Sequence, residues 1–266
     1  MKGLFLTAFR SPALAIAHPG HELRVFGWLT TTRPIVFVLT DGGGSVGRSR
    51  LASTSRILGD AKARVGSIYG RVTDQAMYQA ILNGDTELFT TLATDLAEAL
   101  LTNHVDFVAG DAIEGYNPTH DVWRLIINAA VTLANYQCTQ KIENRDFPLI
   151  GPPDHTDKKT SQNAFIISLD TDLFEKKISA AQAYYELTGE VTDALNSVSQ
   201  ESFKKECFRT APLTGESDGL NNQKPYYESY GERKVATGTY KSVIRRQEHV
   251  LPIARALSAW IKKNIE

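Results

Sequence analysis

Short apolar runs alternate with segments of helical periodicity along the chain. Most of these runs are too short for a helix and are apolar without interruption, which predicts buried strands. The strands are expected at residues 13–17, 34–40, 66–70, 105–109 and 164–169. Helices are expected at about residues 23–29, 48–58, 74–82, 85–103, 122–136, 172–208 and 248–265. Strands that alternate with helices predict an α/β fold with a Rossmann-like parallel sheet flanked by helices.

One domain is expected to span residues 1–266. Its core is expected at about residues 1–170, followed by a helical, Tyr-rich extension at about 171–266 that is irregular between about residues 210 and 240. The length of 266 residues and the apolar fraction of 42% are enough for a full hydrophobic core. Because no apolar stretch approaches about 20 residues, we expect no membrane span.

The composition limits which binding partners and which cellular compartment we expect for this protein. The formal net charge of −1 argues against nucleic acid as a partner. The two cysteines, Cys138 and Cys207, are too few for a disulfide framework. Residues 1–17 end in Ala-x-Ala as a signal peptide does, but Arg10 and Pro12 interrupt their apolar run. We therefore expect a cytoplasmic protein that binds a small molecule, with a homo-oligomer allowed.

Histidines follow two of the predicted strands. The strand at 13–17 ends in His18-Pro19-Gly20-His21, and the strand at 105–109 runs into a loop that carries His120. In open α/β sheets, ligands bind at the carboxyl ends of the strands, so the three imidazoles are expected to converge. Three protein ligands with one open position are typical of a catalytic zinc ion.

The same residues resemble a known family. Ala17-His18-Pro19-Gly20-His21-Glu22 resembles the Ala-His-Pro-Asp-Asp-Glu signature of the PIG-L/LmbE-like de-N-acetylases. Leu39-Thr40-Asp41-Gly42 is similar to that family's second-strand loop, and Asn117-Pro118-Thr119-His120 falls where the family has His-Pro-Asp-His. The resemblance covers roughly residues 1–140. It implies a Rossmann-like fold, a zinc ion and hydrolysis of an N-acetyl group on an amino sugar.

Carried over by position, the resemblance names the zinc ligands and also marks departures. The ligands are His18, His21 and His120, with His21 standing where the family has an aspartate ligand. The family's general base corresponds to Gly20, which cannot transfer a proton. Its helper residues correspond to Asn117 and Thr119 in this chain. Metal binding is therefore expected to be kept while the family's proton-transfer groups are absent.

Carboxylates elsewhere on the sheet edge are candidates for the missing base. A zinc ion held by three histidines lowers the pKa of its bound water to about 7, which reduces the need for a base. The candidate bases are Asp41, Asp111, Glu114 and Asp121, with Asp111 and Glu114 favoured because they flank the His120 loop. Each can instead orient a ligating imidazole. Glu22 is expected to cap the first helix.

A Tyr-rich stretch at residues 225–233 has the composition of a sugar-binding surface. Sugars offer apolar ring faces and many hydroxyl groups, which match aromatic faces beside charged side chains. We expect Tyr227, Glu228 and Arg233, together with Asn117, to bind substrate. A packed surface loop is the alternative for this stretch.

The sequence therefore predicts a zinc-dependent hydrolase, a deacetylase that acts on an N-acylated or O-acylated sugar, sugar nucleotide or glycoconjugate precursor. One alternative is a metal-binding relative without turnover. Another is an NAD(P)-binding Rossmann enzyme, because residues 42–47 match G-x-G-x-x-G between a strand and a helix. The fingerprint also needs an acidic residue about 20 positions later, and no predicted strand clearly precedes Asp74.

Overall fold

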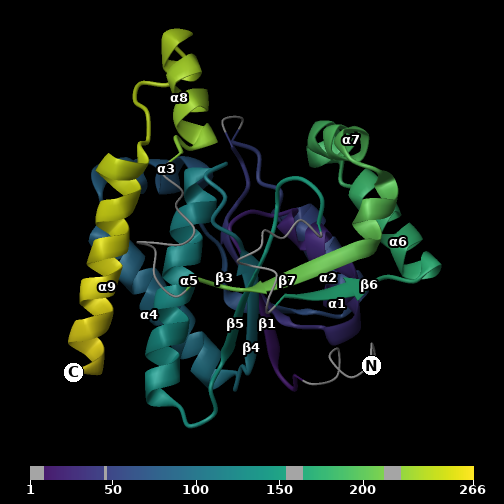
Figure 1. Ribbon diagram of the computed structural model, residues 1–266, viewed down its shortest axis with the longest axis horizontal. Helices are drawn as coiled ribbons and strands as arrows, with labels where there is room; N and C mark the ends of the chain where they lie inside the picture. Colours follow the sequence, from purple (N-terminus) through teal and green to yellow (C-terminus); the bar gives the residue numbers. More distant parts are fainter. Residues whose placement is uncertain (1–8, 45–46, 154–163, 213–222) are drawn as a thin grey trace.

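The computed structural model describes residues 9–44, 47–153, 164–212 and 223–266. The strands within these residues are β1 Pro12–Ile16, β2 Ile35–Thr40, β3 Arg64–Val72, β4 Phe107–Asp111, β5 Glu143–Phe147, β6 Phe165–Ser168 and β7 Lys205–Thr210. They form a mixed sheet in the order β3-β2-β1-β4-β5-β7-β6 (Figure 1). Strands β1 to β5 are parallel, and β7 runs antiparallel to both β5 and β6. The predicted α/β fold is confirmed.

Helices cover both faces of this sheet. The α-helices are α1 Phe26–Thr32, α2 Leu51–Ala61, α3 Asp74–Asn83, α4 Thr86–Thr102, α5 Pro118–Gln137, α6 Thr171–Gln182, α7 Thr188–Ser197, α8 Tyr226–Ala236 and α9 Leu251–Ile265. Shorter turns are η1 His21–Val25, η3 Tyr185–Leu187, η4 Gln200–Lys204 and the π-helical η5 Arg246–Val250. In the described residues, no helix is long and apolar enough to cross a membrane.

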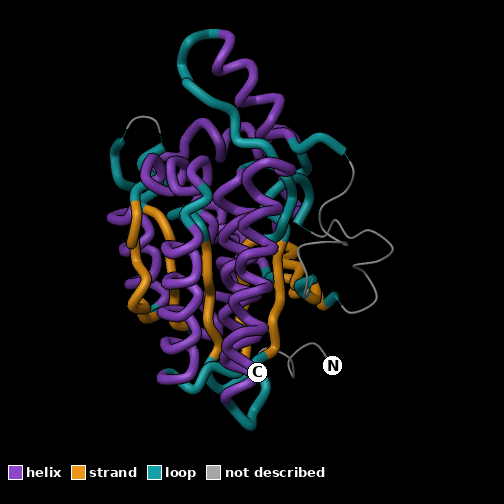
Figure 2. Tube along the Cα trace, turned by 90° about the vertical axis from the view of Figure 1, so that its left-hand side faces the viewer, coloured by secondary structure: helices purple, strands orange, loops and turns teal. Residues whose placement is uncertain are grey.

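Alternation along β1 divides the hydrophobic core in two. Ala13 and Ala15 face a cluster built with α3, α4, α5 and α9, and Leu14 and Ile16 face one built with α1 and α2. All four side chains are fully buried, as expected for a central strand covered on both faces. Figure 2, viewed from the side of α9, shows the long helices of the first cluster in front of the strands.

Strands β5 and β7 were not predicted, because their sequences are polar. Asn144 of β5 accepts a hydrogen bond at 3.0 Å from Arg124, a fully buried side chain of α5. Asp146 of β5 pairs with Arg209 of β7 at 2.7 Å. Since these buried polar groups are paired within the sheet or with α5, apolar periodicity does not mark the two strands.

Several helix boundaries differ from those predicted. Helix α2 continues past Gly59 and ends at Ala61, and its C-cap Lys62 takes the left-handed conformation at φ 56°. The single helix predicted at 172–208 is α6, η3, α7 and η4, followed by β7. The irregular segment predicted near 210–240 contains α8, while its residues 213–222 lie outside the described residues, as do Ser45 and Val46 of the glycine-rich loop.

Candidate active site

Three histidine side chains meet at the carboxyl edge of the sheet. His18 follows β1, His21 opens η1, and His120 lies in the first turn of α5. The ring centroids are 5.3 Å apart for His18 and His21, 4.9 Å for His18 and His120, and 4.6 Å for His21 and His120. They converge because β1 pairs with β4 in parallel, so that both strands end at this edge. The structure thus gathers the three predicted ligands in one cluster.

The turn between His18 and His21 depends on Gly20. Its φ of +105° is a conformation that L side chains rarely adopt. The Gly20 N–H donates to Glu22 Oε2 at 2.7 Å, and the Thr54 hydroxyl donates to Glu22 Oε1 at 2.7 Å. Burial raises the pKa of Glu22 to about 7, although the hydrogen bonds from Thr54 and Gly20 act to lower it. Glu22 is fully buried, and it therefore fixes the turn from inside the protein.

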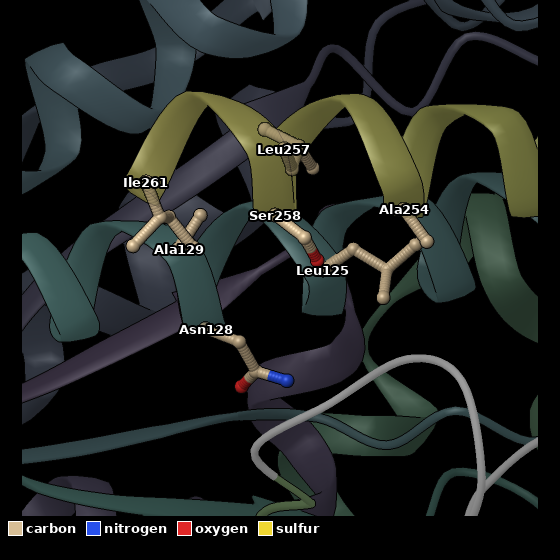
Figure 3. Close-up of a pocket in the computed structure, with 7 residues that line it drawn as sticks. All are labelled: Leu125, Asn128, Ala129, Ala254, Leu257, Ser258 and Ile261. Atoms are coloured by element: carbon tan, nitrogen blue, oxygen red, sulfur yellow. The ribbon is translucent and has the colours of Figure 1, made fainter. Parts of the chain in front are cut away.

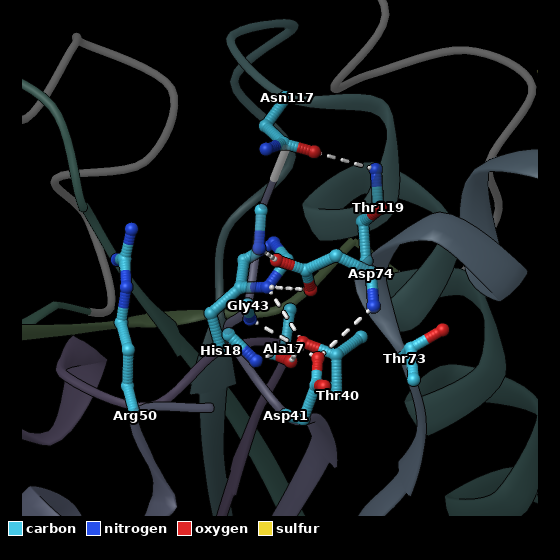
Figure 4. A network of polar contacts seen from close by, with 12 residues as sticks. Ala17, His18, Thr40, Asp41, Gly43, Arg50, Thr73, Asp74, Asn117 and Thr119 are labelled. Carbon is cyan, nitrogen blue, oxygen red and sulfur yellow. Dashed lines mark hydrogen bonds and ion pairs between the residues drawn. The ribbon is translucent and has the colours of Figure 1, made fainter. Parts of the chain in front are cut away.

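The Nδ1 atom of His18 is hydrogen-bonded to a hydroxyl and lies beside a carboxylate (Figure 4). It lies 2.7 Å from Thr40 Oγ1 and 3.0 Å from Asp74 Oδ1. Since the Thr40 hydroxyl donates to the carbonyl oxygen of Ala17 at 3.0 Å, it accepts from His18 Nδ1. The ring proton of neutral His18 therefore sits on Nδ1. Its Nε2 is buried and has no hydrogen-bond partner among the described residues.

Asp74 was not predicted as a site residue. It stands in the first turn of α3, where its Oδ2 accepts the N–H of Gly44 at 2.7 Å. Burial acts to raise the pKa of Asp74, but the hydrogen bond and charge of His18 outweigh it and hold this pKa well below its usual range. Its place at the site was not predicted, because the strand before it was expected to end at residue 70. In the structure β3 ends at Val72, which places Asp74 at the same sheet edge as His18.

Asp111 holds the second histidine. Its Oδ2 lies 2.9 Å from His21 Nδ1 and accepts the N–H of Ala17 at 2.7 Å. An ionised carboxylate only accepts hydrogen bonds, so the proton of neutral His21 also sits on Nδ1. Asp111 is fully buried at the end of β4. Its contacts correspond to the orienting role that the sequence left open for it.

His120 is the most enclosed of the three rings. Burial lowers its pKa well below the ordinary value, and the nearby rings of His21 and His18 lower it further. Its imidazole is therefore neutral at pH 7. Asn117, predicted to bind substrate, caps the helix that carries His120, since its Oδ1 accepts the N–H of Thr119 at 2.8 Å.

The donor chemistry of this cluster suits a zinc ion, whereas the present ring positions do not enclose one. Neutral imidazoles whose Nδ1–H is held by a carboxylate or hydroxyl are typical of histidines that bind metal through Nε2. The unpartnered, buried Nε2 of His18 fits that pattern. Yet in the described part of the chain, no group of three or more His, Cys, Asp or Glu side chains is arranged so that it could hold a metal ion.

The other three candidate carboxylates accept hydrogen bonds from the backbone. Asp121 Oδ1 accepts the N–H groups of Glu114 and Gly115, both at 3.2 Å. Asp41 Oδ1 accepts the N–H groups of Gly43 and Asp74, both at 3.1 Å. The two oxygens of Glu114 accept the N–H groups of Leu149 at 2.9 Å and Ile150 at 3.3 Å, and burial raises the pKa of Glu114 to about 7. Among the described residues, none of these three carboxylates is hydrogen-bonded to a histidine ring, in contrast to Asp111.

Side chains from the segment that follows β6 fill the space beside Gly20. A Cβ atom added to Gly20 would lie 2.3 Å from Leu187 Cδ1 and 3.8 Å from Tyr184 Cζ. Tyr184 is fully buried, and its hydroxyl contacts Thr54 Oγ1 at 2.9 Å. Leu187 thus occupies the place where a side chain of residue 20 would point. Sequence reasoning could not find this contact, because 167 residues separate the two positions.

The three other predicted substrate-binding residues lie on different sides of α8. Tyr227 is 2% exposed, and Glu228 is buried with its Oε1 accepting the N–H of Arg246 at 2.9 Å. These two therefore attach the helix to the protein. Arg233 lies on the solvent side, with its guanidinium carbon 5.7 Å from the ring centroid of Tyr226.

Two cavities among the described residues are lined by none of the three histidines. One of about 30 Å³ lies between α5 and α9, room for little more than one water (Figure 3). Its lining is Leu125, Asn128, Ala129, Ala254, Leu257, Ser258 and Ile261. A larger groove of about 430 Å³ runs between β3 and the end of α4. The candidate site is thus assigned from its side chains and not from a cavity.

The sheet and its flanking helices form an α/β fold that solved deacetylase structures share. Solved structures that share it include the zinc-inhibited form of teicoplanin deacetylase Orf2, with a TM-score of 0.52 at 11% identity. A complex of a deacetylase from the teicoplanin biosynthesis pathway with bog gives 0.51 at 13% identity. Each comparison covers 78% of this chain and 100% of the other. No family model and no curated protein sequence matches the chain.

Proposed function

We propose that this protein is a zinc-dependent deacetylase that hydrolyses an N-acylated or O-acylated sugar. The observation that carries the proposal is the cluster of His18, His21 and His120, in which two Nδ1 atoms are each held by an acceptor. The shared fold of the teicoplanin deacetylases supports it. The proposed ligands are these three histidines, whose rings must turn to face a common ion. A zinc ion so bound supplies a Lewis acid and lowers the pKa of its water.

The chain's own groups would orient the site. Asp111 and the pair Thr40 and Asp74 keep the protons of His21 and His18 on Nδ1. The neutral state of His120 leaves its electron pair available at pH 7. Because Asp41 and Glu114 are hydrogen-bonded to backbone, we assign neither as the general base.

A second function is favoured by one specific observation. Gly20 stands where the resembling family carries its base, and Leu187 fills the adjoining space. A protein that binds metal without turnover would have this arrangement.

One pair of measurements tests both proposals. Metal content is determined by mass spectrometry on the purified protein before and after chelation, for the parent, His120→Ala and the control His104→Ala. We expect about one zinc per chain in the parent and the control and most of it lost in His120→Ala. Amine release from N-acetylglucosamine and acetate release from an O-acetylated sugar then separate an active enzyme from a binding protein. Full zinc occupancy in His120→Ala would refute the ligand assignment.

A further inference from the structure

Exposed tyrosines gather beside the candidate active site. The rings of Tyr116 and Tyr226 stack with centroids 5.0 Å apart and planes 4° from parallel. Tyr116 is 44% exposed and Tyr226 is 48% exposed. Tyr230 lies one helical turn further along α8, its ring centroid 6.0 Å from that of Tyr226. Large aromatic rings left in water in one place mark a surface that binds something.

Two basic side chains, Arg233 and Lys234, lie against these tyrosine rings. The Arg233 guanidinium carbon lies 5.7 Å from the ring centroid of Tyr226 and 5.9 Å from that of Tyr230. Lys234 Nζ lies 5.3 Å from the centroid of Tyr230. We call Tyr116, Tyr226, Tyr230 and Arg233 the aromatic platform. It offers flat apolar faces, phenolic hydroxyls and a guanidinium donor within one patch.

The opposite face of α8 fixes the platform in place. Tyr227 is buried, and its N–H donates to the carbonyl oxygen of Gly115 at 3.3 Å. Glu228 accepts the N–H of Arg246 at 2.9 Å, and a Cβ at Gly231 would lie 3.1 Å from Val243. With this face tied to the protein, the aromatic face is held toward solvent. Its orientation is therefore set before any ligand arrives.

The platform is close in sequence to one histidine of the cluster. Tyr116 directly precedes Asn117, the cap of α5, and His120 follows in the first turn of that helix. Figures 1 and 2 show α8 projecting beyond the end of the sheet where α3 and α5 begin. The segment that begins α5 therefore carries His120 at one end and Tyr116 of the platform at the other.

We infer that the aromatic platform is a subsite for a further sugar ring, so that the substrate is an oligosaccharide. The inference rests on the proposed function, which places the acylated sugar at the histidines. A pyranose ring has one face of C–H groups that packs on an aromatic ring, and hydroxyls at its edge that accept from arginine or tyrosine. The platform supplies both kinds of partner.

The test uses N,N′,N″-triacetylchitotriose as the probe and N-acetylglucosamine as the short comparison. Binding to the full-length protein is followed by NMR of labelled tyrosine rings, for the parent, Tyr226→Ala and Tyr136→Ala. Tyr136 is a matched control because it is 62% exposed near the other end of α5, about 24 Å from His120 along the helix. We expect Tyr226→Ala to weaken trisaccharide binding about threefold to tenfold, with no change for the control or for the monosaccharide.

Failure of this inference is distinct from failure of the proposed function. Trisaccharide binding that is absent in the parent, or unchanged in Tyr226→Ala, would overturn the subsite even if N-acetylglucosamine is hydrolysed. Binding that depends on Tyr226 without any hydrolysis would leave the subsite standing and count against the deacetylase. Equal losses in Tyr226→Ala and Tyr136→Ala would show a general effect on the fold and overturn the subsite as well.

Discussion

Substitution of Gly20 is expected to destabilise the protein through two separable effects. An alanine at φ +105° costs about 1–2 kcal/mol of backbone strain. Its Cβ would also lie 2.3 Å from Leu187 Cδ1, far inside the usual carbon contact distance of about 3.5–4.0 Å. Forcing Leu187 aside costs about 1–3 kcal/mol, as in overpacked cores. Gly20→Ala should therefore lower the free energy of unfolding by roughly 2–5 kcal/mol.

A double-mutant cycle with Leu187→Ala separates the two effects. In the Leu187→Ala background the steric part disappears, so Gly20→Ala should cost only about 1–2 kcal/mol. Gly84→Ala is the matched control, because Gly84 has φ +63° and nothing within 4 Å of an added Cβ. Urea unfolding followed by circular dichroism measures all five proteins. An equal cost of Gly20→Ala in both backgrounds would refute the argument that Leu187 fills this space.

Three further outcomes are expected. Asp111→Asn should weaken zinc affinity about 10–100-fold in a competitive chelator titration, since it leaves the ligands in place and disturbs the group that orients His21; unchanged affinity would contradict the orienting role. NADH should not raise the Tm, whereas a ligand at 100 times its Kd would add about 2.7 kcal/mol and favour the dinucleotide alternative. Because burial raises the folded-state pKa of Glu114 from 4.5 to about 7, ionisation of this carboxyl disfavours folding. As the pH rises from 4.5 to 7, the parent should lose up to about 3 kcal/mol of unfolding free energy relative to Glu114→Gln. A difference between the two proteins that does not change with pH would contradict this.

The sequence predicts what depends on local pattern. The continuous apolar run of β1 and the Pro-Gly break after it place His18 and His21 correctly at a strand end. The i+4 leucines of α4 mark a helix with a defined buried face, and the structure has it at Thr86–Thr102. The meeting of His120 with the other two follows from the parallel sheet, so it too could be anticipated.

What the sequence does not predict depends on partners far along the chain. Glu206 falls within the helix predicted over residues 172–208, yet it lies in β7 and is fully buried. It accepts the N–H groups of Gly27 and Trp28 at 2.8 Å and pairs with Lys177 at 2.8 Å. Tyr227 was predicted to bind substrate but is buried, because the helix turns it by about 100° from the exposed side of Tyr226 toward the protein. Such residues are decided by tertiary contacts that no local pattern records.

The place of β7 in the sheet has a consequence for how the protein is made. Strand β5 ends at Phe147. Its free edge is covered by β7, in which Arg209 pairs with Asp146. A ribosome must therefore add more than 60 residues before that edge can be covered. Until then the nascent chain presents unpaired N–H and C=O groups to any neighbouring strand. The charged side chains of β5 hide the apolar pattern of a strand. During this interval they also disfavour pairing of the exposed edge with a strand of another molecule.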